Sequence, residues 1–249
     1  MTTFGMIGHP LEHSASAEWF NRMFEAEGID ACYQEYALES AAQVQEMFNE
    51  KSFAGVNVTY PYKQTVLSML DELSPLAKAI GAVNVVDNNH GRLVGYNTDA
   101  VGFETSLLHI FQSQNTNTDN LKALILGTGG VSKAVSFVLE KHNIPYNFVS
   151  RTKKEYLLYS QLTADIVRQH RLIINCTPLG MFPDINFKPD IDYDGIGSNH
   201  ILFDTIYNPP ITQFLNEGKL RGAKIYNGKM MLVKQAEAAW DKWAYHVNY

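Results

Sequence analysis

The segment "GVNVTYPYKQ" ends in a lysine that could move a proton. Its alternation predicts a half-buried strand over Gly55–Tyr60 with Asn57 and Thr59 on the polar face, because successive side chains point to opposite sides. Pro61 cannot donate to a sheet, so we expect the strand to end there, with Lys63 at its mouth. These three polar side chains could then face one substrate. A solvated edge strand followed by a helix-starting lysine is the plain alternative for this segment alone.

An acidic partner for this lysine occurs in "VGYNTDAVGF", where Asp99 stands at an expected helix start. Aspartate at such a position is ordinarily a helix cap, and that reading stays open for Asp99 alone. Asn84, in "GAVNVV", is expected on a strand. Lysine and aspartate brought together form a proton-transfer pair, because each sets the charge of the other and a hydroxyl can bridge them.

Composition narrows the class of function. The chain has 249 residues, of which 45% are hydrophobic, enough for one or two domains. A formal charge of −6 disfavours nucleic acid and anionic membranes as partners, so we expect a small-molecule substrate. We also expect no metal ion. Cys32 and Cys176 lie in no C-x-x-C motif, and the amino terminus lacks a basic region followed by an apolar run. We therefore expect a cytoplasmic protein with free thiols and no transmembrane span.

Strands and helices alternate along the chain, which is typical of α/β folds with mainly parallel sheets. Two helix starts have explicit caps, a capping box at Ser40 with Gln43 and a proline following Ser74, and "NNHGR" predicts a hairpin turn. The polar stretch "QSQNTNTDN" indicates the edge of a second domain. The expected strands are Phe4–Gly8, Ala31–Leu38, Gly55–Tyr60, Ala82–Val86, Leu93–Tyr96, Ala123–Leu126, Asn147–Ser150, Leu172–Cys176, Ile201–Thr205 and Lys224–Tyr226.

A glycine cluster in "LILGTGGVSKAV" predicts a dinucleotide-binding turn. A buried strand runs into Gly127, Gly129 and Gly130, which allow a sharp turn and a close approach of a pyrophosphate to the next helix. Ser132 stands where the usual fingerprint has its third glycine, so a glycine-rich turn without a ligand stays open.

A basic residue ends the next expected strand, in "NFVSRTKK". Arg151 follows Gly127 by 24 positions (151 − 127), where an NAD-binding unit would place an acidic residue for the ribose hydroxyl. Arginine suits the 2′-phosphate of NADP instead, and Thr152 adds a hydroxyl. For Lys153 and Lys154 alone, a solvated basic loop is the plainer interpretation.

Taken together in order, these motifs resemble the shikimate dehydrogenase family. The matching segments are "GMIGHPLEHSAS", "GVNVTYPYK", "GAVNVV", "GYNTDAVGF", "LGTGGVSKA", "SRT", "NCTPLGM", "YNPPIT" and "NGKMMLVKQA". The resemblance implies that Lys63 and Asp99 are catalytic, in reversible NADPH-dependent reduction of 3-dehydroshikimate to shikimate. It implies substrate contacts from Ser14, Ser16, Asn57, Thr59, Asn84, Tyr207 and Gln235, and cofactor contacts from Gly127, Gly129, Gly130, Ser132, Arg151, Thr152, Thr177, Gly180, Gly228 and Met231.

The resemblance also implies an architecture. Residues 1–100, completed by a C-terminal helix over 228–249, would form an α/β substrate-binding domain. Residues 101–227 would form a Rossmann-like NADP-binding domain, with the active site in the cleft between the domains. A homodimer is a possible assembly.

Several features depart from the family pattern. Ala17 replaces a proline, Ser150 replaces an asparagine, and only 24 positions separate Arg151 from Asn175 (175 − 151). We therefore expect a crossover helix to be lost there, with a strand retained in "YLLYSQLT". Two alternatives stay open: a quinate-type dehydrogenase, and a non-catalytic NADP-sensing module on the same fold.

Overall fold

The chain is represented by a computed structural model that describes residues 1–11, 16–113 and 118–247. Contacts divide it into two units, each with its own sheet. The first unit comprises Met1–Val101 with Gln235–Tyr249, and the second comprises Gly102–Lys234. The division falls within two helices, α4 (Asp99–Ser113) and α8 (Lys229–Trp243).

The first unit is built on a mixed sheet with the strand order β2-β1-β3-β5-β6-β4. β1 is parallel to β2 and β3, whereas β5 is antiparallel to both β3 and β6. The carboxyl ends of β3 and β6 therefore lie at one edge, together with the amino end of β5. The strands are β1 (Thr2–Gly8), β2 (Ala31–Ala37), β3 (Gly55–Val58), β4 (Glu72–Leu73), β5 (Val85–Asn89) and β6 (Arg92–Tyr96).

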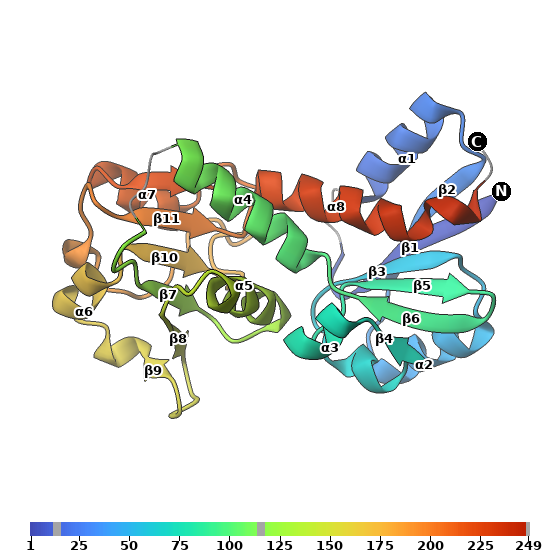
Figure 1. Cartoon of the computed structure of the whole chain (residues 1–249), viewed down its shortest axis with the longest axis horizontal. Helices are drawn as coiled ribbons and strands as arrows, with labels where there is room; N and C mark the ends of the chain where they lie inside the picture. Colours follow the sequence, from blue (N-terminus) through green and yellow to red (C-terminus); the bar gives the residue numbers. More distant parts are fainter. Residues whose placement is uncertain (12–15, 114–117, 248–249) are drawn as a thin grey trace. The chain divides into compact units, whose positions relative to one another are not determined.

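Helices cover both faces of this sheet (Figure 1). On one face α1 (Ser16–Glu27) and the carboxyl half of α8 pack around Phe4, and on the other lie α2 (Ala41–Glu50), the short helix η1 (Thr65–Ser68) and α3 (Pro75–Ile80). Trp243 of α8 stacks on Phe4 with ring centroids 5.4 Å apart, and its indole nitrogen donates to the carbonyl of Val86 at 3.1 Å. This contact requires a glycine at Gly55, because a Cβ there would lie 2.2 Å from Trp243 Nε1.

Local signals in the first unit form as predicted. Ser40 and Gln43 make the capping box of α2, and Ser74 caps α3 with a proline at its first turn. The hairpin between β5 and β6 turns at His90 and Gly91, both at positive φ, which suits the tight two-residue connection.

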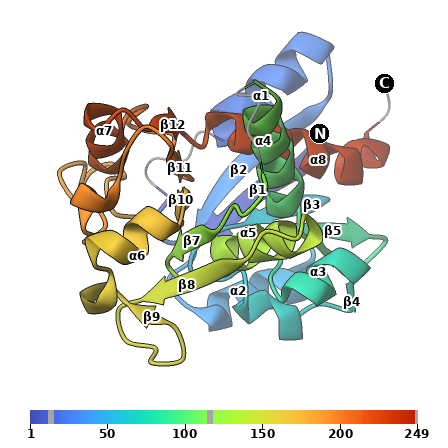
Figure 2. The ribbon, with the colours of Figure 1, turned by 60° about the vertical axis from the view of Figure 1, so that its left-hand side comes forward.

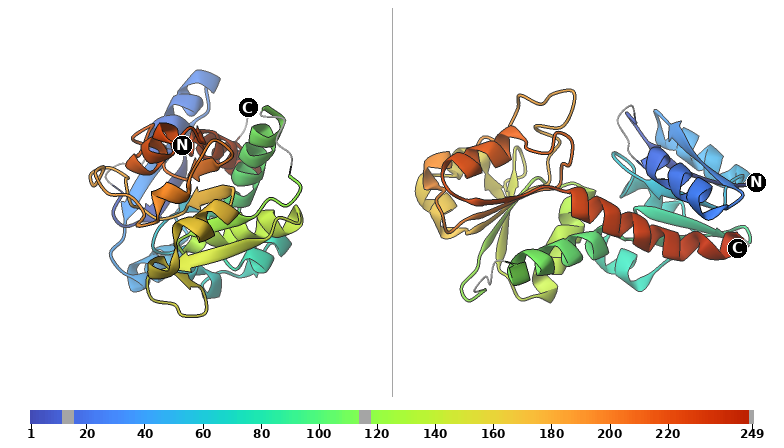
Figure 3. Two further views of the ribbon diagram at one scale, coloured as in Figure 1. Left: turned by 90° about the vertical axis from the view of Figure 1, so that its left-hand side faces the viewer. Right: turned by 90° about the horizontal axis from the view of Figure 1, so that it is seen from above.

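The second unit is built on a parallel sheet with the order β12-β11-β10-β7-β8-β9. α4 and α5 lie on one side and α6 and α7 on the other, as Figure 2 and the right-hand view of Figure 3 show. Strands buried on both faces, such as "ALIL" and "LIIN", suit such a layered arrangement. The elements are β7 (Ala123–Leu126), α5 (Gly130–Lys141), β8 (Tyr146–Ser150), β9 (Leu157–Leu158), η2 (Tyr159–Gln161), α6 (Ala164–Gln169), β10 (Leu172–Asn175), η3 (Tyr193–Gly195), β11 (Ile201–Asp204), α7 (Gln213–Leu220) and β12 (Lys224–Tyr226); η4 (Ala244–His246) follows α8 in the first unit.

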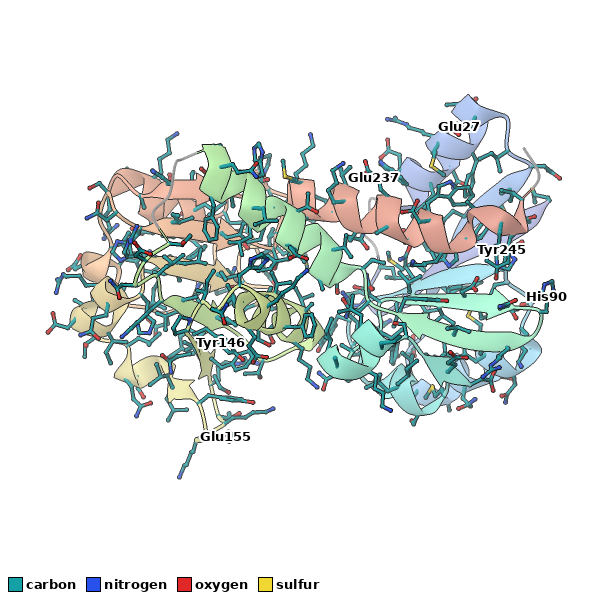
Figure 4. The ribbon with its side chains drawn as sticks, in the orientation of Figure 1. Glu27, His90, Tyr146, Glu155, Glu237 and Tyr245 are labelled. Carbon is teal, nitrogen blue, oxygen red and sulfur yellow. The ribbon has the colours of Figure 1, made fainter. Side chains whose placement is uncertain are left out.

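The connection between β8 and β9 contains no helix. Residues 151–156 join these two parallel strands, and the structure describes all six of them. Parallel strands are ordinarily linked by a dozen residues or more. Aromatic side chains pack beside this connection, with the ring centroid of Phe148 lying 5.3 Å from that of Tyr146 and 5.0 Å from that of Tyr156. Figure 4 shows Glu155 in this connection, projecting away from the sheet.

Several sequence-based boundaries differ from the structure. β3 ends at Val58 rather than at Tyr60, because the chain turns at Thr59 and leaves the Tyr60 side chain 73% exposed. β3 is also not an edge strand, since it pairs with β1 and β5. β5 begins at Val85, so Asn84 precedes the strand. The polar stretch that was expected to mark a domain edge includes residues 114–117, which lie outside the described residues. Within the described ranges, no helix is both long and apolar enough to cross a membrane.

Candidate active site

Lys63 and Asp99 form an ion pair at the carboxyl edge of the first unit's sheet. Lys63 Nζ lies 2.7 Å from Asp99 Oδ2, and the two side chains are only 13% and 8% exposed. They meet because Lys63 follows β3 and Asp99 follows β6, whose carboxyl ends share an edge. The carbonyl of Lys63 also accepts from the amide of Val83 at 2.8 Å, which ties this turn to the chain before β5.

Asp99 is available for this pair because another residue caps its helix. Asn97 Oδ1 accepts from the amide of Ala100 at 3.1 Å, so the carboxylate of Asp99 does not serve the cap. Asn84 Nδ2 donates towards Asp99 Oδ1 (3.2 Å), Thr98 Oγ1 (2.9 Å) and Gln235 Oε1 (3.2 Å). Its two N–H groups are thus shared among three acceptors, and Asn84 organises both the carboxylate and the helix that carries Gln235.

A second chain of polar contacts runs along the same sheet from Asn57. Tyr33 Oη donates to Asn57 Oδ1 at 2.6 Å, and Asn57 Nδ2 donates to the carbonyl of Asn84 at 3.3 Å. Burial, followed by the charge of Glu35, raises the pKa of the Tyr33 hydroxyl well above its ordinary value, and a hydrogen bond with Ser16 opposes this shift. Ser16, the first residue of α1, is therefore connected to Asn57 through Tyr33.

Two further predicted substrate residues belong to the first unit, Thr59 and Ser14. The amide of Thr59 donates to the carbonyl of Ile7 at 2.9 Å, so Thr59 sits where β3 leaves the sheet. Ser14 lies outside the described residues.

In the second unit, the glycine turn joins β7 to α5. Gly127 adopts a φ of +104°, and a Cβ there would lie 3.2 Å from the carbonyl oxygen of Cys176. Gly129 precedes α5 without a side-chain cap, and a Cβ there would meet open space. Gly130 begins the helix, so uncapped backbone amides are available to an anion. Ser132 is fully buried and its hydroxyl donates to the carbonyl of Gly129 at 2.6 Å, so it supports the turn from inside.

Arg151 and Thr152 stand beyond the carboxyl end of β8, the neighbour of β7. Both side chains are exposed, and Arg151 makes no ion pair within the described part of the chain. Ser150 is buried, and its hydroxyl accepts from the amides of Thr152 and Lys153 at 3.3 and 3.1 Å. This serine therefore shapes the turn that presents Arg151.

The other predicted cofactor residues follow β10 and β12. Thr177 donates to Asn175 Oδ1 through both its amide (3.0 Å) and its hydroxyl (2.7 Å). Gly180 has a φ of +96°, and Gly228 is buried so closely that a Cβ would lie 2.2 Å from the carbonyl oxygen of Thr205. Met231 is buried in the first turn of α8.

Tyr207 follows β11 in the second unit and is partly buried. In a parallel sheet, the segments that follow β7, β8, β10, β11 and β12 all leave from one edge, where α/β sheets bind their ligands. The structure thus gathers the predicted cofactor residues and Tyr207 at one edge of the second unit, and Lys63, Asp99 and Asn84 at one edge of the first.

Comparison with known proteins identifies the family. Residues 6–86 match the family model for the shikimate dehydrogenase substrate-binding domain. Shikimate dehydrogenase (NADP(+)) of Carboxydothermus hydrogenoformans is 35% identical, over 96% of this chain and 90% of that relative. The chain belongs to the shikimate dehydrogenase family.

Solved structures of the shikimate dehydrogenase family agree with this assignment. Shikimate dehydrogenase 1 from Peptoclostridium difficile is 34% identical with a TM-score of 0.83, covering 98% of this chain and 92% of that one. The enzyme from Thermus thermophilus, solved with NADP(H) and shikimate, is 32% identical with a TM-score of 0.80, covering 98% and 93%. The two-domain α/β fold predicted for a shikimate dehydrogenase is confirmed.

Two polar residues of this candidate site were not predicted from the sequence. Tyr33 links Ser16 to Asn57, and Thr98 binds Asn84 both through its hydroxyl and through its amide, which donates to Asn84 Oδ1 at 2.6 Å. The polar pattern "YNTD" could have indicated Thr98. Nothing in the sequence around Tyr33 distinguishes it from an ordinary strand tyrosine, because its role depends on strand order.

Proposed function

We propose that this chain is an NADP-dependent shikimate dehydrogenase that reduces 3-dehydroshikimate to shikimate reversibly, within the biosynthesis of chorismate and aromatic amino acids. The observation that carries this proposal is the nearly buried Lys63–Asp99 pair, 2.7 Å apart and held by Asn84. An ammonium and a carboxylate in contact at the edge of a sheet are suited to moving one proton to or from a substrate oxygen.

In the direction of reduction, the carbonyl carbon gains a hydride and its oxygen gains a proton. NADPH, when bound, supplies the hydride. Lys63 donates a hydrogen bond to the carbonyl oxygen and gives up a proton as negative charge develops there. Asp99 holds the ammonium in position through its Oδ2, and oxidation runs through the same steps in reverse.

Substrate orientation falls to the polar side chains around this pair. Asn57, Thr59, Asn84 and Gln235 contact the ring hydroxyls or support those that do, and Ser14 and Ser16 hold the carboxylate with Tyr207. The Tyr33 contact supports this proposal, because it joins Ser16 to Asn57 and so couples the carboxylate end to the ring contacts.

The second unit fits NADP. The uncapped start of α5 after Gly129 suits the pyrophosphate, and exposed Arg151, with no competing ion pair among the described residues, suits the 2′-phosphate. Thr152 adds a hydroxyl beside that phosphate, while Thr177, Gly180, Gly228 and Met231 surround the nicotinamide. The active site in a cleft between the two units stays a prediction.

The test is turnover in purified protein with shikimate or quinate, each with NADP or NAD. We expect shikimate with NADP to be the preferred pair. Better turnover of quinate would contradict the choice of substrate, and no turnover with any pair would favour a non-catalytic role. The relatives reported above are shikimate dehydrogenases, which does not favour the quinate alternative, and the intact Lys63–Asp99 pair argues against a non-catalytic role.

Assembly and location complete the proposal. We propose that the enzyme is cytoplasmic and assembles as a homodimer. Sedimentation equilibrium of the purified chain, with and without NADP, would test the homodimer, and a single species at the monomer mass of 28.0 kDa would contradict it.

A further inference from the structure

Asp204, the last residue of β11, is a buried carboxylate without a cationic partner among the described residues. It is 0% exposed, and its contacts are neutral donors: Thr212 Oγ1 at 2.6 Å, the amide of Ile206 at 3.0 Å and Asn175 Nδ2 at 3.1 Å. A buried charge without a counter-ion costs stability. Packing alone therefore does not explain why a carboxylate is buried at the edge of the second unit's sheet where the predicted cofactor residues lie.

The first contact of Asp204 reaches the segment that follows β10. Asn175 donates to Asp204 through Nδ2, and its Oδ1 then accepts both the amide and the hydroxyl of Thr177. Because one end of the amide is held by the carboxylate, its other end has a single orientation towards Thr177. Asn175 Nδ2 also lies 3.4 Å from the carbonyl of Leu179, next to Gly180.

The other contacts of Asp204 reach the segment that follows β11. Its Oδ1 accepts the amide of Ile206, the neighbour of Tyr207, and its Oδ2 accepts the hydroxyl of Thr212, the N-cap of α7. The carbonyl of Ile206 in turn accepts the amide of Gly228 at 3.0 Å. One carboxylate thus connects three segments, and these segments carry the residues proposed to surround the nicotinamide.

We infer that Asp204 is a positioning residue that preorganises the nicotinamide end of the cofactor site, acting through Asn175, Ile206 and Thr212. This inference rests on the proposed NADP-dependent function. It assigns the adenosine end to different residues, Arg151 and Thr152, whose turn is shaped by Ser150 and, among the described residues, is not hydrogen-bonded to Asp204.

The charge state of Asp204 agrees with this role. Burial raises its pKa to about 6, and its three hydrogen bonds oppose the shift. At neutral pH the group is therefore ionised and accepts from all three donors at once. If the carboxyl group were protonated, one of its oxygens would become a hydrogen-bond donor, although the groups around it, Asn175 Nδ2, the Ile206 amide and Thr212 Oγ1, donate to it.

The experiment measures binding by the unloaded protein, with NADPH and with 2′-phospho-ADP-ribose, which lacks the nicotinamide. For Asp204→Asn we expect the Kd of NADPH to rise about tenfold, because hydrogen bonds to a charged acceptor are lost where preorganisation counts. The Kd of 2′-phospho-ADP-ribose should stay within about twofold. As the matched control, Arg151→Ala should weaken both ligands.

Other outcomes of this binding experiment would overturn the role inferred for Asp204. An equal loss of both ligands in Asp204→Asn would show a merely structural role, and an unchanged Kd of NADPH would show no role; either result overturns the inference while leaving the proposed function in place. If the unaltered protein binds neither ligand, the proposed function fails and the inference fails with it.

A second variant covers the case in which Asp204→Asn does not fold. Thr212→Val removes one of the three donors and leaves the carboxylate paired with the other two. We expect it to weaken NADPH several-fold and to leave 2′-phospho-ADP-ribose unaffected. Unchanged binding of NADPH by this folded variant would likewise overturn the inference.

Discussion

Replacing Lys63 by alanine should abolish most of the turnover of this enzyme. Its Nζ is 2.7 Å from Asp99 Oδ2 and its side chain is only 13% exposed, so the ammonium is held in one place beside the carboxylate. A positioned acid or base contributes roughly 10²- to 10⁴-fold to rate. At about 1.4 kcal/mol for each factor of ten, that is about 3 to 5 kcal/mol of transition-state stabilisation. The Michaelis constant for shikimate should change much less.

The same substitution should also cost folding stability. Asp99, with its side chain 8% exposed, would keep Asn84 but lose its counter-ion. Removing one member of a buried ion pair costs about 3 to 5 kcal/mol, and the residual exposure of both groups places the expectation near the lower value. Urea denaturation of Lys63→Ala must therefore accompany the kinetic assay, so that loss of folded protein is not read as loss of catalysis.

A matched double variant separates these effects. In Lys63→Ala with Asp99→Asn, the unpaired charge is gone, so the free energy of unfolding should recover by a large part of the loss, whereas kcat should stay low. The decisive assay is steady-state kcat with saturating shikimate and NADP. A folded Lys63→Ala variant with kcat within about tenfold of the unaltered protein would refute the role of Lys63 as proton donor. Asp99 would then be the candidate for that role.

Three further predictions concern other parts of the molecule. Arg151→Ala should raise the Michaelis constant for NADP and leave that for NAD nearly unchanged, because only NADP has the 2′-phosphate; equal use of both cofactors by the unaltered protein would contradict the assignment. Tyr33→Phe keeps the ring stacked on Phe20 at 4.6 Å but removes the hydroxyl bound to Asn57, so it should raise the Michaelis constant for shikimate more than it lowers kcat, and a pure kcat effect would count against this reading. Burial raises the pKa of Asp204 from 3.8 to about 6, so this carboxyl group ionises less readily in the folded state than in the unfolded state. The stabilising contribution of the protonated carboxyl group to folding is therefore complete below pH 3.8 and is lost as the pH rises through 6. The gap corresponds to about 3 kcal/mol, and the difference in free energy of unfolding between the unaltered protein and Asp204→Asn, measured in urea, should fall by up to that amount between about pH 4 and pH 7; parallel curves would disprove it.

Local pattern was sufficient for much of the fold. Alternating side chains and continuous apolar runs predict most of the strands, with β7 and β12 matching their expected bounds. The capping box at Ser40 and the hairpin at Gly91 were equally readable, because caps and tight turns depend on residues only a few positions apart. The glycine turn at Gly127 belongs to the same class, since its positive φ is a property of one residue.

The sequence also determined which groups can do chemistry. Lys63 and Asp99 stand out because each follows a strand and belongs to a motif of the shikimate dehydrogenase family. What the sequence could not provide was their distance, since 36 positions separate them (99 − 63). That they meet depends on β6 being antiparallel to β5 and β5 to β3, which places both carboxyl ends at one edge.

Only the tertiary structure decided which residues support these groups. Asn84 and Gln235 are 151 positions apart in the chain, yet their side chains share a hydrogen bond. Tyr33 contacts Asn57 across the order of the strands, and Asp204 collects three neutral donors from segments that look like ordinary loops. Periodicity reports which face of an element is buried, but hydrogen-bond partners depend on strand order and helix placement, which arise from contacts between distant parts of the chain.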